Sequence, residues 1–220
     1  MLKSSFIGLA LIASLFGAEA AHAEAPIHVY GPGGPAPAMQ EAAKAFGAAH
    51  HVEVLVVAGP TIDPASVEPL YLRPAAILVR PGNPDHITGI TDLFKPGHHI
   101  LVVNGAGQQG LWEDVAGRTG SIADIRGFRH NIAMVAGNSA AARADWIKDK
   151  SLDAWLIWNI WQVANPSLAT TVPIAPRYAI YRDAGIALTH AGEARPMVRQ
   201  FAAFLASAKG KAIFTKWGWQ

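Results

Sequence analysis

Two spacings of apolar residues alternate along this chain, one typical of strands and one typical of helices. Short runs rich in β-branched residues predict buried strands at 27–30, 52–57, 100–103, 132–136, 154–158 and 170–174. Stretches in which apolar residues return every three or four positions predict helices at 36–49, 111–116, 121–126, 140–148, 196–206 and 209–217. Two longer extended segments are predicted at 69–80 and 180–189. This alternation is typical of an α/β fold.

Three of the predicted strand-to-helix turns contain glycine, asparagine or serine. They lie at 31–34, 104–110 and 137–139. In open parallel sheets, ligands bind beyond the carboxyl ends of the strands, where such turns converge. The backbone N–H groups at a helix N-terminus favour an anion there. The residues that we expect to bind a ligand in these turns are Gly31, Gly33, Gly34, Gly105, Ala106, Gly107, Asn138 and Ser139.

The beginning of the chain has the pattern of a cleavable signal peptide. Lys3 precedes an apolar segment at 6–16, which is short for a membrane span, and Ala21 and Ala23 give the small-x-small pattern of a cleavage site. We therefore expect a signal peptide over residues 1–23, a mature chain that begins at Glu24, and a periplasmic location. The alternative is an N-terminal membrane anchor.

Composition narrows the class of protein. The 220 residues include no cysteine, so disulfides and thiolate metal ligands are excluded and stability must come from a buried core. The hydrophobic content of 51% with 15% charged residues agrees with a well-buried fold. A formal net charge of +2 is too small to indicate a nucleic-acid partner.

Several candidate residues have structural alternatives. Asn138 and Ser139 either bind an anion or cap the helix that follows them. Arg182 either binds a ligand carboxylate or phosphate or forms a salt bridge. The tryptophans at 155, 158 and 161 are expected to pack in the core and at an interface, and the alternative is stacking on a base or sugar. The pairs at 50–51 and 98–99 are expected to be surface histidines rather than metal ligands, because adjacent side chains point to different sides.

No pattern in the chain indicates an enzyme. Ser139 opens a predicted helix, but the sequence around it lacks the second glycine of a nucleophile elbow. Glu113 and Asp114 are neighbours on a predicted helix, so they make a poor acid–base pair. We therefore expect no catalytic residues and no metal site.

Ordered motifs over nearly all of the mature chain resemble those of the accessory colonization factor family of periplasmic solute-binding proteins, which are distant relatives of the molybdate- and sulfate-binding proteins. The matching positions are 29–35, 59–60, 70–71, 73, 82–84, 105–107, 112–114, 117–119, 128–129, 131–132, 138–139, 142–143, 153–155, 158, 161, 165–166, 181–182, 214 and 216–219.

The resemblance implies a type II periplasmic binding protein fold with two lobes and two hinge crossings. Lobe 1 would hold 24–78 and 178–220, lobe 2 would hold 79–177, and the crossings would lie at 73–79 and 177–181. Family members bind small organic or phosphate-bearing anions in the cleft between the lobes, and some form homodimers. The implied function is capture of such an anion for an ABC-type membrane transporter or a receptor. Arg182, from its side-chain chemistry, is a further candidate ligand residue.

Two departures from the family pattern lie in the first lobe and after Gly107. Relatives have a helix and a strand after the second strand, whereas here residues 61–65 lead directly into the hinge segment, so the first lobe is expected to be shortened. Relatives also have a Lys/Ser/Thr-rich stretch where this chain has only Gln108 and Gln109. The alternative function is therefore a non-transport interaction protein in the periplasm or at the cell surface that kept the fold and lost ligand binding.

Overall fold

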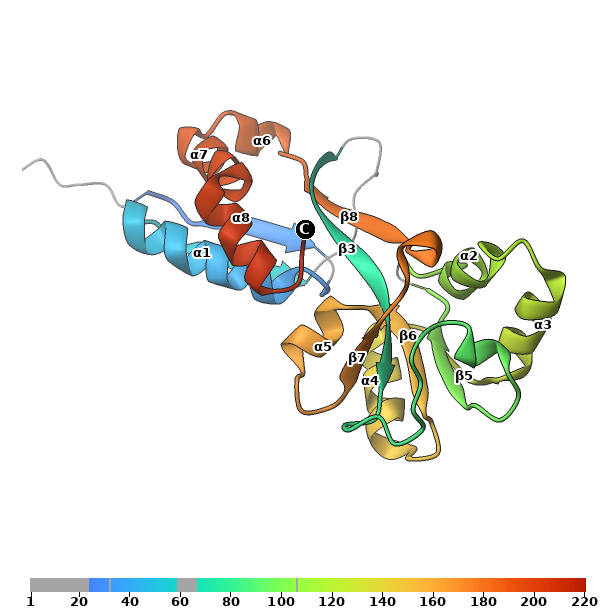
Figure 1. The fold of residues 1–220 in the computed structure, drawn as a ribbon. Helices are drawn as coiled ribbons and strands as arrows, with labels where there is room; N and C mark the ends of the chain where they lie inside the picture. The colour runs from blue at the N-terminus through green and yellow to red at the C-terminus, as the bar shows by residue number, and fades with distance from the viewer. Residues whose placement is uncertain (1–23, 32, 59–66, 106) are drawn as a thin grey trace, which may run out of the picture.

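The computed structural model describes residues 24–31, 33–58, 67–105 and 107–220. The predicted signal peptide at 1–23, the predicted ligand residue Ala106 and the motif at 59–60 lie outside these residues. The elements form two groups, joined by the strand β3 (Glu68–Val79) and the strand β8 (Tyr181–Ile186) (Figure 1). We call the group that holds Glu24, where the described residues begin, and the C-terminal Gln220 the first lobe, and the other group the second lobe.

The first lobe begins with a β-α-β unit. Strands β1 (Ile27–Gly31) and β2 (Val54–Ala58) pair in parallel, and helix α1 (Ala36–His50) connects them. Helices α6 (His190–Glu193), α7 (Pro196–Ala206) and α8 (Ala208–Lys216) complete this lobe. The buried ring of Phe46 on α1 lies 5.1 Å from the ring of Phe201 on α7, so aromatic packing joins the beginning of the chain to its end.

The second lobe is built on a six-stranded sheet, in which five strands follow the order β5-β4-β6-β3-β7 and β8 pairs with β3. Its other strands are β4 (Ile100–Val103), β5 (Ile132–Ala136), β6 (Ala154–Trp158) and β7 (Thr170–Pro173). Its helices are α2 (Leu111–Gly117), α3 (Ile122–His130), α4 (Ser139–Lys148) and α5 (Ile160–Ala164), with 3-10 turns at Asp92–Phe94 and Pro176–Tyr178. All five residues of β6 are buried, as expected for a strand covered on both faces.

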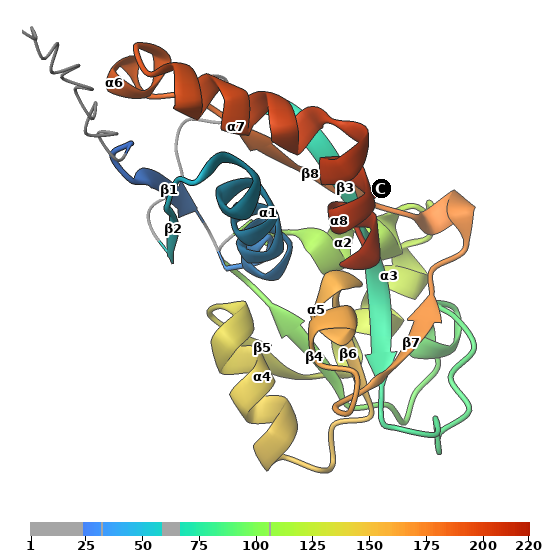
Figure 2. The same cartoon turned by 90° about the vertical axis from the view of Figure 1, so that its left-hand side faces the viewer.

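Strand β3 belongs to both lobes. Its first half, Glu68 to Pro74, pairs with β8, and its second half, Ala75 to Val79, pairs with β6 and β7 (Figure 2). The change of partner at Pro74 and Ala75 falls within the predicted crossing at 73–79. The exact lobe boundaries that we predicted remain a prediction. Between β2 and β3 lie only nine residues, and among the described residues β1 does not pair with β3 or β8.

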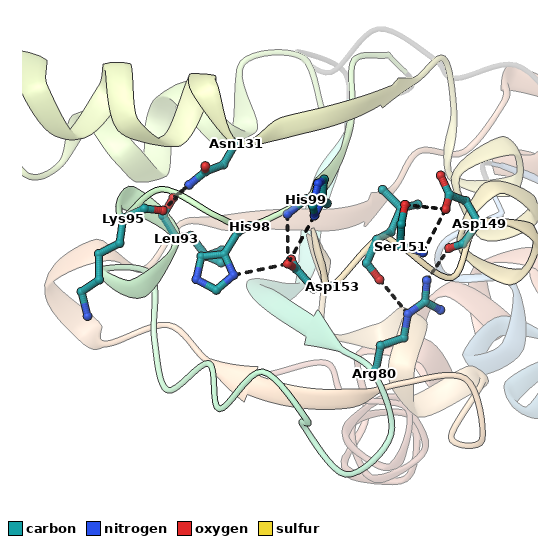
Figure 3. A network of polar contacts seen from close by, with 10 residues as sticks. Arg80, Leu93, Lys95, His98, His99, Asn131, Asp149, Ser151 and Asp153 are labelled. Carbon is teal, nitrogen blue, oxygen red and sulfur yellow. Dashed lines mark hydrogen bonds and ion pairs between the residues drawn. The ribbon is translucent and has the colours of Figure 1, made fainter.

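Polar contacts fix the end of the second lobe that is far from the first (Figure 3). The guanidinium of Arg80 donates to the backbone carbonyls of Leu152, Trp146 and Asp149 at 2.7, 2.9 and 2.5 Å, and it lies 3.7 Å from the centre of the Trp146 ring. Nearby, Asp153 accepts a hydrogen bond from the backbone of His99 at 3.0 Å. Arg80 therefore ties β3 to the segment that joins α4 to β6.

The second of the two adjacent histidines at 98–99 is exposed, whereas His98 is half-buried. Its Nδ1 lies 3.4 Å from a carboxylate oxygen of Asp153. Among the described residues, no group of three His, Cys, Asp or Glu side chains has the arrangement of a metal site.

The expectation that the tryptophans pack in the core is confirmed for Trp155 and Trp158, which are 2% and 1% exposed. The helices α5 and α6 were missed because each is too short to show a helical period. Consequently, the extended segment predicted at 180–189 ends at Ile186. In the part of the chain that the structure describes, no helix combines the length and apolar character needed to cross a membrane.

Candidate functional site

The carboxyl ends of the central strands of the second lobe face the first lobe. Strands β4, β5 and β6 are parallel, and β6 ends at Trp158, opposite Ala75, where β3 changes partner. The turns that follow these strands therefore lie between the two lobes, and Figure 2 shows the beginning of α4 on the side of its lobe that faces the first lobe. This is the edge at which parallel sheets bind ligands. We call this region the junction.

The turns after β4 and β5 are in contact. A Cβ atom on Gly105 would lie 2.3 Å from the backbone oxygen of Gly137, so the close approach of the two turns requires glycine. The buried Gln108 donates from Nε2 to the Oγ of Ser139 at 2.5 Å. The structure thus brings together the predicted residues Gly105, Gly107, Asn138 and Ser139, of which Gly107 and Asn138 are exposed.

Asn138 and Ser139 both have structural roles. The side chain of Asn138 accepts from the backbone N–H of Ala141 at 2.9 Å and is the N-cap of α4, so the capping prediction is confirmed for this residue. The Oγ of Ser139 accepts from Gln108, and its O–H can still donate to another group. Capping at Asn138 is compatible with an anion at the same helix end.

The turn after β1 approaches the junction from the first lobe. Atoms added at the Cβ positions of Gly31 and Gly33 would meet nothing within 4 Å. A Cβ on Gly34 would lie 2.5 Å from Nη1 of Arg73 and 3.5 Å from Cδ1 of Ile160, the first residue of α5. The turn is therefore in contact with the segment that follows β6, and its first two glycines leave space beside the backbone.

Arg73 lies at the junction beside the end of β6, and we did not single it out as a ligand residue from the sequence. It is the last residue before Pro74, at the change of partner in β3. Its Cζ lies 4.8 Å from the ring centre of Trp158 and 5.4 Å from that of Trp219. Burial lowers the pKa of Arg73 to about 10, with opposing effects from Asp183 and Arg182. The guanidinium is still charged at neutral pH.

The predicted ligand residue Arg182 forms a salt bridge that connects the two lobes. Its Nη2 on β8 lies 2.9 Å from Oδ2 of Asp114 on α2, and both side chains are 44% exposed. This is the arrangement that we gave as the alternative for Arg182. Because the pair is exposed, it contributes little to stability.

Two hollows on the surface of the first lobe lie away from these turns. One has a volume of about 420 Å³ and lies between α1 and β2, with Gln40, Lys44 and Val54 in its lining. The other, of about 340 Å³, lies beside the beginning of β3 and the C-terminal Gln220. Neither contains a candidate residue from the three turns.

A sequence signal for Arg73 did exist. It is a charged residue within a long apolar extended segment and one of the positions that match the family motifs. A charge at such a position is uncommon unless it is paired or has a function. Its partners, however, come from the end of β6 and the end of the chain, which the sequence pattern does not connect.

Comparisons with known proteins agree with this architecture. The model of a family described as bacterial extracellular solute-binding protein matches residues 60–220. PEB3 from Campylobacter jejuni is 31% identical, with a TM-score of 0.76 over 88% of this chain and 99% of that chain. The structure of PEB3 with bound L-phospholactate has the same identity and coverage and a TM-score of 0.78. The comparison with curated proteins gave no match.

A solved structure of lower sequence identity is evidence for the fold only. The sulfate-binding protein SubI from Mycobacterium tuberculosis is 14% identical, with a TM-score of 0.66 over 89% of this chain and 86% of that chain. The α/β fold is thus that of the type II periplasmic binding proteins, as the motifs predicted. The resemblance to solute-binding proteins is likewise confirmed.

Proposed function

The chain belongs to the bacterial extracellular solute-binding protein family, and from this premise we propose that it captures a small anion between its two lobes. The ligand classes are an organic acid, a phosphate-bearing metabolite or an inorganic oxyanion. The captured ligand would be delivered to an ABC-type membrane transporter or presented to a receptor. We further propose a periplasmic location, no nucleic-acid partner, no cofactor and no catalytic activity.

The observation that carries this proposal is the convergence of anion-binding features at the junction. The turns after β4 and β5 are in contact with each other, and the turn after β1 reaches the segment after β6, where the charged guanidinium of Arg73 lies over Trp158. Helix N-termini and an arginine both favour negatively charged groups. The proposed ligand residues are Gly31, Gly33, Gly34, Gly105, Ala106, Gly107, Asn138, Ser139 and Arg182.

The relatives support an anion in particular. PEB3, at 31% identity, binds L-phospholactate in its structure, which carries a phosphate and a carboxylate. SubI, which shares the fold, is a sulfate-binding protein. Two-lobed proteins of this kind respond to a ligand by closing around it.

Calorimetric titration tests the proposal directly. The purified protein is titrated with L-phospholactate, phosphoglycerate, citrate, phosphate, sulfate and molybdate, and its melting temperature is measured with each. We expect saturable 1:1 binding of at least one anion. At about 100 times the Kd, ligand should add about 2.7 kcal/mol of stability, or roughly 5–10 °C in melting temperature. Neutral sugars are the control, and the absence of a response to every anion would overturn the proposal.

A second candidate function is an interaction protein without a ligand. Tyr30 on β1 and Val57 on β2 are neighbours in the register and are 63% and 45% exposed, so this face of the first lobe offers an apolar contact surface. The tryptophans of β6, which we also considered as an interface, are buried. A homodimer measured by light scattering, together with no ligand response, would favour this function over the first.

A further inference from the structure

We propose that Arg73 binds the charged group of the ligand and that this group is a carboxylate or phosphate gripped by the forked guanidinium. This inference rests on the proposed function and adds to it the residue that selects the ligand. It replaces no other candidate, because the residues in the turns would contact the same ligand through backbone N–H groups and short polar side chains.

The guanidinium is held in place from both lobes. Trp158 ends β6 of the second lobe, and Trp219 belongs to the chain end in the first lobe. Leu72 and Gln220 exchange two backbone hydrogen bonds of 2.8 Å, which fixes the chain end beside β3. Both tryptophans are at most 2% exposed, so they are rigid walls. A cation over aromatic faces is stabilised, but these faces accept no conventional hydrogen bond from it.

The hydrogen-bonding capacity of Arg73 is not used within the described part of the protein. Its Nε is fully buried and has no partner, and none of the described residues forms an ion pair with the guanidinium. Two other arginines of the chain, in contrast, do have hydrogen-bond or ion-pair partners. Arg80 donates to three carbonyls, and Arg182 is paired with Asp114. A buried charge without a counter-charge is costly, and an anionic ligand would compensate for it.

The charges around Arg73 leave room for an anion. On β8, Arg182 lies opposite Arg73 and Asp183 lies opposite Leu72, and their effects on the pKa of Arg73 oppose each other. Asp114 is already paired with Arg182, and neither Asp114 nor Asp183 forms an ion pair with Arg73. The residue as a whole is half-buried, so part of its surface remains accessible.

Gly34 places the guanidinium beside the beginning of α1. Nη1 of Arg73 lies 2.5 Å from the position that a Cβ of Gly34 would take. A larger residue at position 34 would push the guanidinium away. The arrangement therefore brings the donors of Arg73 next to the first turn of a 15-residue helix, whose N-terminus also favours negative charge.

The shape of the donor group limits the ligand class. A guanidinium presents parallel N–H groups that match two oxygens of one carboxylate or phosphate, which a lysine ammonium does not. We therefore expect oxygen anions with two free oxygens on one centre to bind and chloride to bind weakly. The choice between a carboxylate and a phosphate is decided by titration.

The test compares three variants with wild type by calorimetry, using L-phospholactate, inorganic phosphate and citrate as probes. Arg73→Gln should lower the affinity for the probe that wild type binds most tightly by about 100-fold or more. Arg73→Lys, which keeps the charge but lacks the forked donors, should lower it by about 10-fold. The control is Arg129→Gln, which removes the same charge from an exposed arginine that lies 5.0 Å from the ring centre of Trp112. It should change affinity by less than about twofold.

Gly34→Ala keeps every charge and should still lower the affinity for that probe, because the added methyl group displaces Nη1 of Arg73. This variant and Arg73→Lys keep the test valid if Arg73→Gln does not fold, which circular dichroism would reveal. Wild type that binds and an Arg73→Gln variant with unchanged affinity would overturn this inference alone. Wild type that binds no probe would overturn the proposed function and this inference with it.

Discussion

Replacement of Arg73 by methionine should not destabilise the unliganded protein. Replacement of a buried residue that packs against large side chains usually lowers the stability of a protein. Arg73 differs because none of the described carboxylates forms an ion pair with it, although the charge of Asp183 acts on it from a greater distance. Methionine keeps much of the apolar stem and removes the charge.

The magnitude follows from two opposing contributions. Burial lowers the pKa of Arg73 from its ordinary value of 12.5 to about 10. At about 1.36 kcal/mol per pKa unit, the folded protein disfavours the charged form by roughly 3 kcal/mol. Against this cost, the cation–π contact with each of the two tryptophan rings stabilises the charged guanidinium by about 1 kcal/mol. The net prediction is that Arg73→Met stabilises the unliganded protein by about 1 kcal/mol, or about 2–4 °C in melting temperature for a chain of this size.

Thermal unfolding followed by circular dichroism at pH 7 measures this difference. Both proteins are first unfolded in guanidinium chloride, dialysed and refolded, so that no bound molecule remains. Arg129→Met, at an exposed position, is the control and should stay within about 0.5 kcal/mol of wild type. A fall of more than about 4 °C for Arg73→Met would refute the reasoning, because it would show that the protein itself already compensates the charge of Arg73.

Three further predictions concern the junction, the second lobe and the pH dependence. Ser139→Ala removes the acceptor of the buried Gln108 amide, so it should cost about 1–3 kcal/mol in the free energy of unfolding, measured with urea; a change below about 0.5 kcal/mol would contradict this. Arg80→Ala loses three hydrogen bonds to carbonyls and should cost about 3 kcal/mol in the same assay, with Arg129→Ala as its neutral counterpart. Glu41 accepts hydrogen bonds from Lys216 and Trp217, which lower its pKa. The stability that the ionised Glu41 contributes is therefore complete above the unfolded-state pKa of about 4.3 and is lost as the pH falls through the lowered pKa of the folded state. Glu41→Gln should consequently have a lower melting temperature than wild type at pH 7, and the two melting temperatures should converge below about pH 4.

The candidate site could be predicted in part because strand-to-helix turns leave a local signal. Gly105 and Asn138 were identified from such turns, and the structure brings their turns into contact. Arg182 was chosen for its forked donors after the hinge segment, where the structure pairs it with Asp114, and Arg73 was not chosen as a ligand residue. Both arginines lie in extended segments of similar character, and only their partners distinguish them.

What the sequence determined by itself is the set of local structures and their class. The alternation of apolar periods predicted most of the strands and helices, and Asn138 caps its helix through a bond to a residue three positions away. Such interactions depend on neighbours in the chain, so one sequence can reveal them. Only the tertiary structure decided which charge lies between the lobes. Arg73 is enclosed by Trp158 and Trp219, which come from distant parts of the chain, and the burial of a charge depends on everything that packs around it.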